Sequence, residues 1–188
     1  MMKQQTVVWK AVEYPGMEYL KFWEQSPGVV VSSVVIGVRA EGAFRLNYYV
    51  ECDDSYTVRA VRLEYEGRDE LSLWKDERGN WYDTEGDLLP DLKGCIDIDI
   101  SATPFTNTLP IKRIAWTVGQ TETLRMVYFL IPEMTFHVDE QRYTCLEQRA
   151  DGATFRFEQL ATGFTAVLPV DADGLVLDYP GLFERVKN

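Results

Sequence analysis

Apolar and polar residues alternate with a period of two along most of this 188-residue chain, and this pattern constrains the fold most strongly. In Phe44–Val50 the even-numbered side chains are apolar and would share one strand face, while Arg45, Asn47 and Tyr49 would share the other. Further strands are expected at 7–12, 30–39, 71–75, 95–100, 124–131, 142–148, 154–159, 164–170 and 175–178. Helical turns are expected only within 14–25 and 87–92. Many short strands separated by turn signals predict an all-β sandwich or an open, coiled barrel.

The apolar face changes parity near Ala60. Tyr56, Val58 and Ala60 would share one face, but the apolar residues continue at Val61 and Leu63 on the opposite parity. Such a phase slip predicts a β-bulge or bend, as in a strongly coiled sheet.

The sequence also contains an internal echo. Phe44–Val50 matches Leu124–Leu130 at an offset of 80 residues, and residues 93–96 match 173–176 at the same offset. Duplication would give two similar antiparallel meanders, about 30–100 and 111–180, within a single domain spanning 1–188. The alternative is coincidence, because strands draw on a limited set of residue types.

Charge and histidine content exclude several functional classes. The formal charge is −11, from 30 acidic and 19 basic residues, which disfavours nucleic acid and the surface of anionic membranes as partners. A single histidine excludes metal sites that need two or three, and we expect no metal site and no cofactor.

The chain is expected to be cytoplasmic. Its start shows no apolar signal segment, and its longest apolar run, 29–38, is too short to insert into a membrane. Cys52, Cys95 and Cys145 are odd in number and form no CxxC pair, which favours reduced thiols.

The most distinctive stretch is GCIDIDISATPFTNTLPIKR, residues 94–113. Asp97 and Asp99 would share a strand face, roughly 6.5–7 Å apart. One interpretation is a recognition site, in which the two aspartates and Asn107 bind sugar hydroxyls beside a wall formed by Phe105. The other is an architectural crossover, whose aspartates pair with Arg113.

This stretch resembles the signature of the glycolipid-binding family long known as a domain of unknown function, with its Gly-Cys-x-Asp-x-Asp strand and Thr-Asn-Thr-Leu-Pro-Ile core. A second similar segment runs from Val170-Asp171 through GLVLDYPGLF, residues 174–183. The resemblance implies duplicated antiparallel meanders forming a strongly coiled, half-open barrel with a long groove, similar to bacterial lipid carriers. It implies no catalytic residues and no cofactor, and a lipid or glycolipid as the partner.

A lipid site needs an apolar wall and a few oriented polar groups. Tyr48 and its echo Tyr128 are candidates for the wall, although aromatic residues fill ordinary cores just as well. Arg45 and Arg125 also echo each other, and could bind an anionic head group or form surface ion pairs.

Two alternatives to a non-catalytic carrier stay open. Asp97 and Asp99 have a spacing that a glycoside or ester hydrolase could use, but parallel carboxylates on one strand do not flank a bond. A structural protein-interaction module is the other, because the Val-rich segment 28–39 could pair through a free strand edge.

Overall fold

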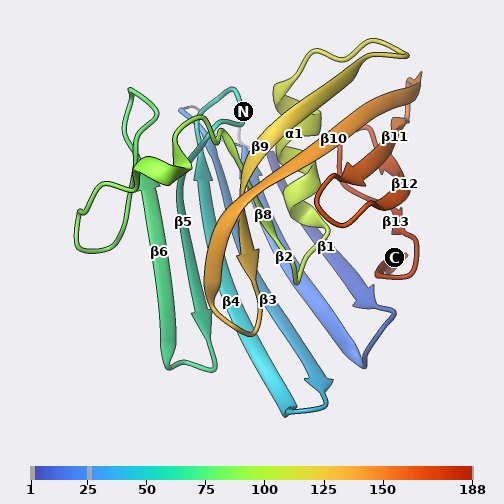
Figure 1. The fold of residues 1–188 in the computed structure, drawn as a ribbon. Helices are drawn as coiled ribbons and strands as arrows, with labels where there is room; N and C mark the ends of the chain where they lie inside the picture. Colours follow the sequence, from blue (N-terminus) through green and yellow to red (C-terminus); the bar gives the residue numbers. More distant parts are fainter. Residues whose placement is uncertain (1–2, 25–26, 188) are drawn as a thin grey trace.

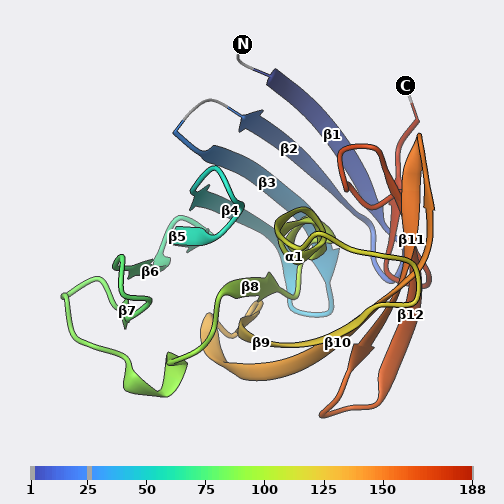
Figure 2. The same cartoon turned by 90° about the horizontal axis from the view of Figure 1, so that it is seen from above.

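The computed structural model describes residues 3–24 and 27–187, which form one antiparallel and one mixed sheet curved around a short helix (Figures 1 and 2). The larger sheet has nine strands in the spatial order β13 (Asp178–Tyr179), β14 (Phe183–Arg185), β1 (Lys3–Ala11), β2 (Gly16–Glu24), β3 (Val29–Arg39), β4 (Gly42–Cys52), β5 (Val58–Tyr65), β6 (Asp69–Lys75) and β7 (Trp81–Tyr82). The smaller sheet has the order β12 (Phe164–Asp171), β11 (Gly152–Gln159), β10 (Thr135–Arg149), β9 (Thr121–Leu130) and β8 (Asp97–Ile100). The predicted all-β, half-open fold is confirmed.

The segment between β8 and β9 fills the space that the two sheets enclose. It contains the 3-10 turn η2 (Phe105–Asn107) and the helix α1 (Thr108–Arg113), which Figure 2 shows inside the curve of the strands. The crossover brings β9 back parallel to β8, since parallel neighbours need a connection of this kind. Phe105 and Leu109 are fully buried, so the signature segment is the plug of the half-barrel.

The alternation of Phe44–Val50 is confirmed in β4, where its apolar members are buried and Arg45 and Tyr49 are exposed. The predicted bulge is also found. Glu51 lies opposite Ala60 and Cys52 opposite Val58, so Arg59 is the extra residue of β5. An extra residue bends its strand, which helps the sheet to coil.

Two predictions of secondary structure were wrong. The helical turn expected within 14–25 is strand β2, with Glu18, Leu20 and Phe22 buried at every second position; Gln25 lies outside the described residues. The strand expected at 175–178 is reduced to a single bridge between Val176 and Val170, followed by the short β13. The turn expected within 87–92 is confirmed as η1 (Pro90–Leu92).

The strands that carry the 80-residue echo lie in different sheets, β4 in the larger and β9 in the smaller. Phe44, Leu46 and Tyr48 are buried in β4, as is Met126 in β9. Duplication of the two halves stays a prediction.

Candidate functional site

Asp97 is neutralised inside the fold. Its carboxylate accepts two hydrogen bonds from Arg113, from Nε at 3.0 Å and from Nη2 at 2.5 Å. The Asp97 side chain is 1% exposed and that of Arg113 16% exposed. Asp97 and Arg113 therefore form the ion pair expected of an architectural crossover. Both carboxylate oxygens of Asp97 are bound by the arginine.

Asp99 has different surroundings. Thr106 Oγ1 donates to its Oδ1 at 2.8 Å and Gln141 Nε2 donates to its Oδ2 at 2.7 Å. Burial raises the pKa of Asp99 above its ordinary value, and the neighbouring Asp139 adds to the shift. Asp99 and Asp97 thus have separate partners, although they lie two residues apart on β8.

A buried polar network continues from Asp99 across the smaller sheet. Gln141 Nε2 also approaches Asp139 Oδ2 at 3.3 Å, and Gln159 Nε2 donates to the same oxygen at 2.9 Å. Tyr143 donates its hydroxyl proton to Asn107 Oδ1 at 2.8 Å, which ties the network to the plug. Low local dielectric strengthens such bonds and fixes the orientation of their members.

An aromatic pocket of about 310 Å³ opens beside this network. Five aromatic residues from five strands line it, namely Tyr128, Phe157, Phe164, Tyr179 and Phe183. The rings of Phe157, Phe164, Tyr179 and Phe183 contact one another, with Phe157 and Tyr179 6.1 Å apart and Tyr179 and Phe183 6.3 Å apart between centroids. Asp99, Thr103, Asn107 and Gln159 supply the polar side of the same pocket.

The structure therefore brings together three of the residues that the sequence singled out, Asp99, Asn107 and Tyr128. It places Phe105 elsewhere: the side chain is fully buried with its ring 6.4 Å from that of Phe22, because it anchors the plug to the larger sheet. Phe105 is therefore not among the residues that line the aromatic pocket.

Tyr48 is likewise a buried residue that bonds other protein groups. Its hydroxyl donates to Glu18 Oε1 at 2.5 Å and lies 3.2 Å from Thr103 Oγ1. Ser33 Oγ donates to the same glutamate oxygen at 2.7 Å, whereas Glu18 Oε2 has no partner among the described residues. Burial raises the pKa of Glu18 from 4.5 to about 7. The larger sheet thus carries an incompletely satisfied carboxyl group behind the plug.

Arg45 and Arg125, the arginines at equivalent positions of the internal echo, lie in different sheets. Arg45 is exposed on the larger sheet, 3.8 Å from Glu64, and Arg125 is exposed on the smaller sheet, where it donates to the carbonyl of Asp91 at 3.4 Å. Each has local partners, so the pair does not form one head-group site.

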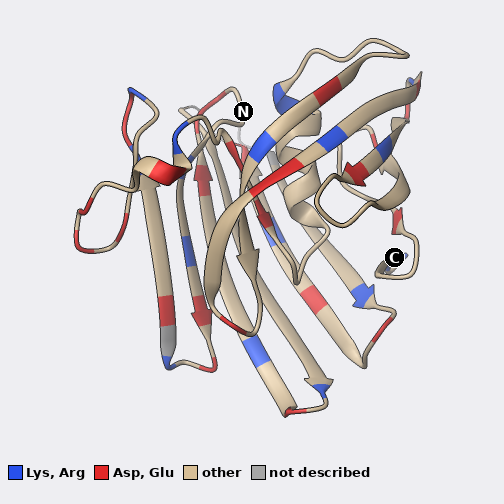
Figure 3. Cartoon of the chain, in the orientation of Figure 1, with Lys and Arg blue, Asp and Glu red and all other residues tan. Residues whose placement is uncertain are grey.

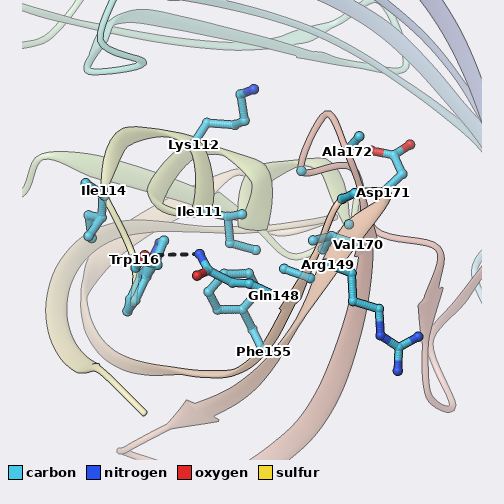
Figure 4. A pocket seen from close by; sticks show the side chains of 15 residues that line it. Ile111, Lys112, Ile114, Trp116, Gln148, Arg149, Phe155, Val170, Asp171 and Ala172 are labelled. Atoms are coloured by element: carbon cyan, nitrogen blue, oxygen red, sulfur yellow. Dashed lines mark hydrogen bonds between the residues drawn. The ribbon is translucent and has the colours of Figure 1, made fainter. Parts of the chain in front are cut away.

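A second opening, the helix-end pocket, lies at the C-terminal end of α1 and has a volume of about 550 Å³ (Figure 4). Ile111, Trp116 and Phe155 form its apolar floor, and Gln148 Nε2 donates to the carbonyl of Trp116 at 3.0 Å. Lys112 and Asp171 lie at its rim in Figure 4. This pocket has room for an apolar group but lies at the opposite end of α1 from Asn107.

Sequence reasoning missed Asp139, Gln141, Gln159 and most of the aromatic cluster. Strand β10 was expected to begin at residue 142, but it begins at Thr135, so Asp139 and Gln141 lie inside it. The signal that could have found them is their parity, which they share with Tyr143. Within residues 3–24 and 27–187, no group of three His, Cys, Asp or Glu side chains is placed to hold a metal ion.

The structure thus combines a half-open β-barrel, a central plug and an aromatic pocket beside a buried polar network. The chain matches the family described as "Putative glycolipid-binding" over residues 6–185, and it belongs to this family. A crystal structure of a DUF1089 family protein from Pseudomonas aeruginosa is similar, with 34% sequence identity and a TM-score of 0.78. The similarity covers 90% of this chain and 92% of that one. No curated protein matches the chain.

In the part of the chain that the structure describes, none of the helices has the length and apolar character needed to span a membrane.

Proposed function

We propose that this protein is a non-catalytic binding protein for a glycolipid, whose sugar head group lies in the aromatic pocket. The observation that carries the proposal is the combination, in one pocket, of five aromatic side chains with the polar groups of Asp99, Asn107 and Gln159. A pyranose ring needs this combination, because its C–H faces pack on aromatic rings while its hydroxyls need oriented acceptors and donors.

The polar side of the pocket is held ready for a ligand. Asp99 accepts one hydrogen bond at each carboxylate oxygen from the protein, and each oxygen has a further lone pair. Gln141 and Thr106 fix the carboxylate in place before a ligand arrives, which lowers the entropic cost of binding.

The size of the pocket favours a head group over an acyl chain. A volume of about 310 Å³ is at the low end of the range of roughly 300–1,000 Å³ for small-molecule sites. The proposal therefore leaves the acyl chains outside the aromatic pocket. The helix-end pocket is the other opening with an apolar floor, and α1 separates it from the head-group site by roughly 9 Å of helix.

The surroundings of the two aspartates support a binding role without catalysis. Asp97 is bound bidentately by Arg113 and does not line the aromatic pocket, so it and Asp99 do not flank a common substrate bond.

The three cysteines are free and buried, which supports the proposal of a reducing, cytoplasmic location.

The test is a calorimetric titration of the protein with monomeric octyl glucoside, which measures the affinity for the sugar head group. Phe164 is 38% exposed and lines the aromatic pocket, so Phe164→Ala is expected to fold normally and to bind about ten-fold more weakly, through the loss of one aromatic contact. Tyr49, which is 37% exposed on the outer face of β4, gives the matched control Tyr49→Ala, expected to bind like the wild type. Equal loss in both variants, or no loss in either, would contradict the proposal.

A further inference from the structure

A third pocket, here called the cationic pocket, lies beside β5, β6 and the segment that leads into β8. Its volume is about 580 Å³. Five basic residues line it, namely Arg59, Lys75, Arg78, Lys93 and Arg113. Only two acidic residues are in the same lining, Asp53 and Glu77. A formal excess of three positive charges (5 − 2 = 3) in one pocket contrasts with the net charge of −11 for the chain, in which acidic and basic residues are otherwise intermixed over both sheets (Figure 3).

Lys75 supplies a buried cationic side chain to this pocket. The residue is 7% exposed, and its ammonium group donates to the carbonyl of Ile96 at 2.9 Å and lies 4.9 Å from the centre of the Trp81 ring. Burial lowers the pKa of Lys75 to about 8, against the raising effect of Asp97. An ammonium group has three N–H donors, and the described residues supply one hydrogen-bond acceptor.

Two arginines add further donors to the same space. Arg113 uses Nε and Nη2 for Asp97, which leaves Nη1 without an acceptor among the described residues. Arg59 uses Nη2 for Asp53 at 2.8 Å, which leaves its Nε and Nη1. Even when Asp97 is counted with the lining, the cations exceed the carboxylates by two (5 − 3 = 2).

We propose that the cationic pocket binds a phosphate or phosphomonoester anion. A tetrahedral phosphate presents acceptor oxygens in several directions, which suits donors arriving from a lysine and two arginines on different elements. Its negative charge, about −1.5 to −2 at pH 7, also compensates the excess of cationic side chains in the lining. The site is separate from the aromatic pocket, because Ile96 and Ser101 lie at opposite ends of β8, about 16 Å apart along the strand.

The test is calorimetric titration of the full chain with inorganic phosphate, at low ionic strength. Wild-type protein is expected to bind one phosphate, and Arg59→Gln to bind it about ten-fold more weakly, through the loss of a charged donor. Arg62→Gln is the matched control, because Arg62 lies on the same strand, pairs with Glu70 and does not line the pocket; it is expected to bind like the wild type. Lys75→Met keeps the aliphatic stem on Trp81, and a circular dichroism spectrum checks that it folds.

No phosphate binding by the wild type, or equal affinity in wild type, Arg59→Gln and Lys75→Met, would overturn the proposal. Cosedimentation with phosphatidic acid vesicles separates the two sources of the anion: binding to vesicles that is lost in Arg59→Gln assigns a lipid head group, and binding of inorganic phosphate alone assigns a soluble phosphate compound. Phe164→Ala is expected to leave phosphate affinity unchanged, so the failure of the glycolipid proposal and the failure of this one are distinguishable.

Discussion

Replacing Arg113 with methionine is expected to lower the free energy of unfolding by about 3–5 kcal/mol. The guanidinium group holds both oxygens of Asp97, whose side chain is 1% exposed. Without the arginine, a carboxylate would remain buried between the plug and β8 with no opposite charge in contact. Urea unfolding followed by tryptophan fluorescence measures the loss.

The double variant Asp97→Asn/Arg113→Met separates the uncompensated charge from the lost packing. Removing both charges is expected to recover more than half of the destabilisation, because an amide is far cheaper to bury than a carboxylate. The exposed pair of Arg149 and Glu147 provides the control, since Arg149→Met is expected to change stability by less than about 1 kcal/mol. A loss of that small size for Arg113→Met would show that the plug does not depend on this ion pair.

The second large effect concerns the dependence of stability on pH. The pKa of Glu18 is about 7 in the folded protein, against 4.5 for the ordinary side chain, because the group is buried. The folded state therefore binds the proton more tightly than the unfolded state. This contribution to stability is complete below pH 4.5 and is lost as pH rises through about 7.

The variant Glu18→Gln does not titrate at this position, so its stability relative to the wild type is expected to increase by roughly 2–3 kcal/mol between pH 5 and pH 8. Urea unfolding curves of both proteins at pH 5, 6, 7 and 8 measure this difference. Tyr48→Phe is the complementary variant, because Tyr48 donates to Glu18 Oε1 and lowers its pKa. Its loss is expected to extend the pH dependence to higher pH. Parallel curves for wild type and Glu18→Gln would refute a buried, titrating carboxyl group.

The sequence predicted the fold where one face of a strand is apolar and the other polar. Phe44–Val50 meets this condition, and both the strand and its buried face were predicted correctly. Strand β2 does not have one apolar and one polar face. Glu18 interrupts its buried face, while the apolar residues Met17 and Tyr19 are exposed on the other face. A polar group on the inner face and apolar groups on the outer face hide the period of two.

The candidate site was predicted in part for the same reason. Asp99 and Asn107 belong to a distinctive local motif, so they could be identified without knowing the fold. Asp139 and Gln141 come from a strand 40 residues later, and their inward orientation depends on the pairing of β10 with β9. Inward-facing polar residues conflict with local patterning, and such conflicts are expected at functional sites.

The plug could not be foreseen from patterning alone. The resemblance implied a long groove, whereas the aromatic pocket is a compact space beside a filled interior. Burial of Phe105 and Leu109 between the sheets requires knowledge of the β8–β9 crossover, which joins strands that are parallel. In the proposed function, the head group therefore contacts the edge of the plug.

Binding of a sugar head group in the aromatic pocket can be observed by nuclear magnetic resonance with isotopically labelled protein and monomeric octyl glucoside. The side-chain amide signals of Asn107, Gln141 and Gln159 report on the polar side of this pocket. If a sugar head group binds there, these signals are expected to shift in a saturable way while that of Asn47, on the outer face of β4, stays fixed. Shifts confined to Asn47 and its neighbours, with the amide signals of Asn107, Gln141 and Gln159 unmoved at saturation, would contradict binding in this pocket.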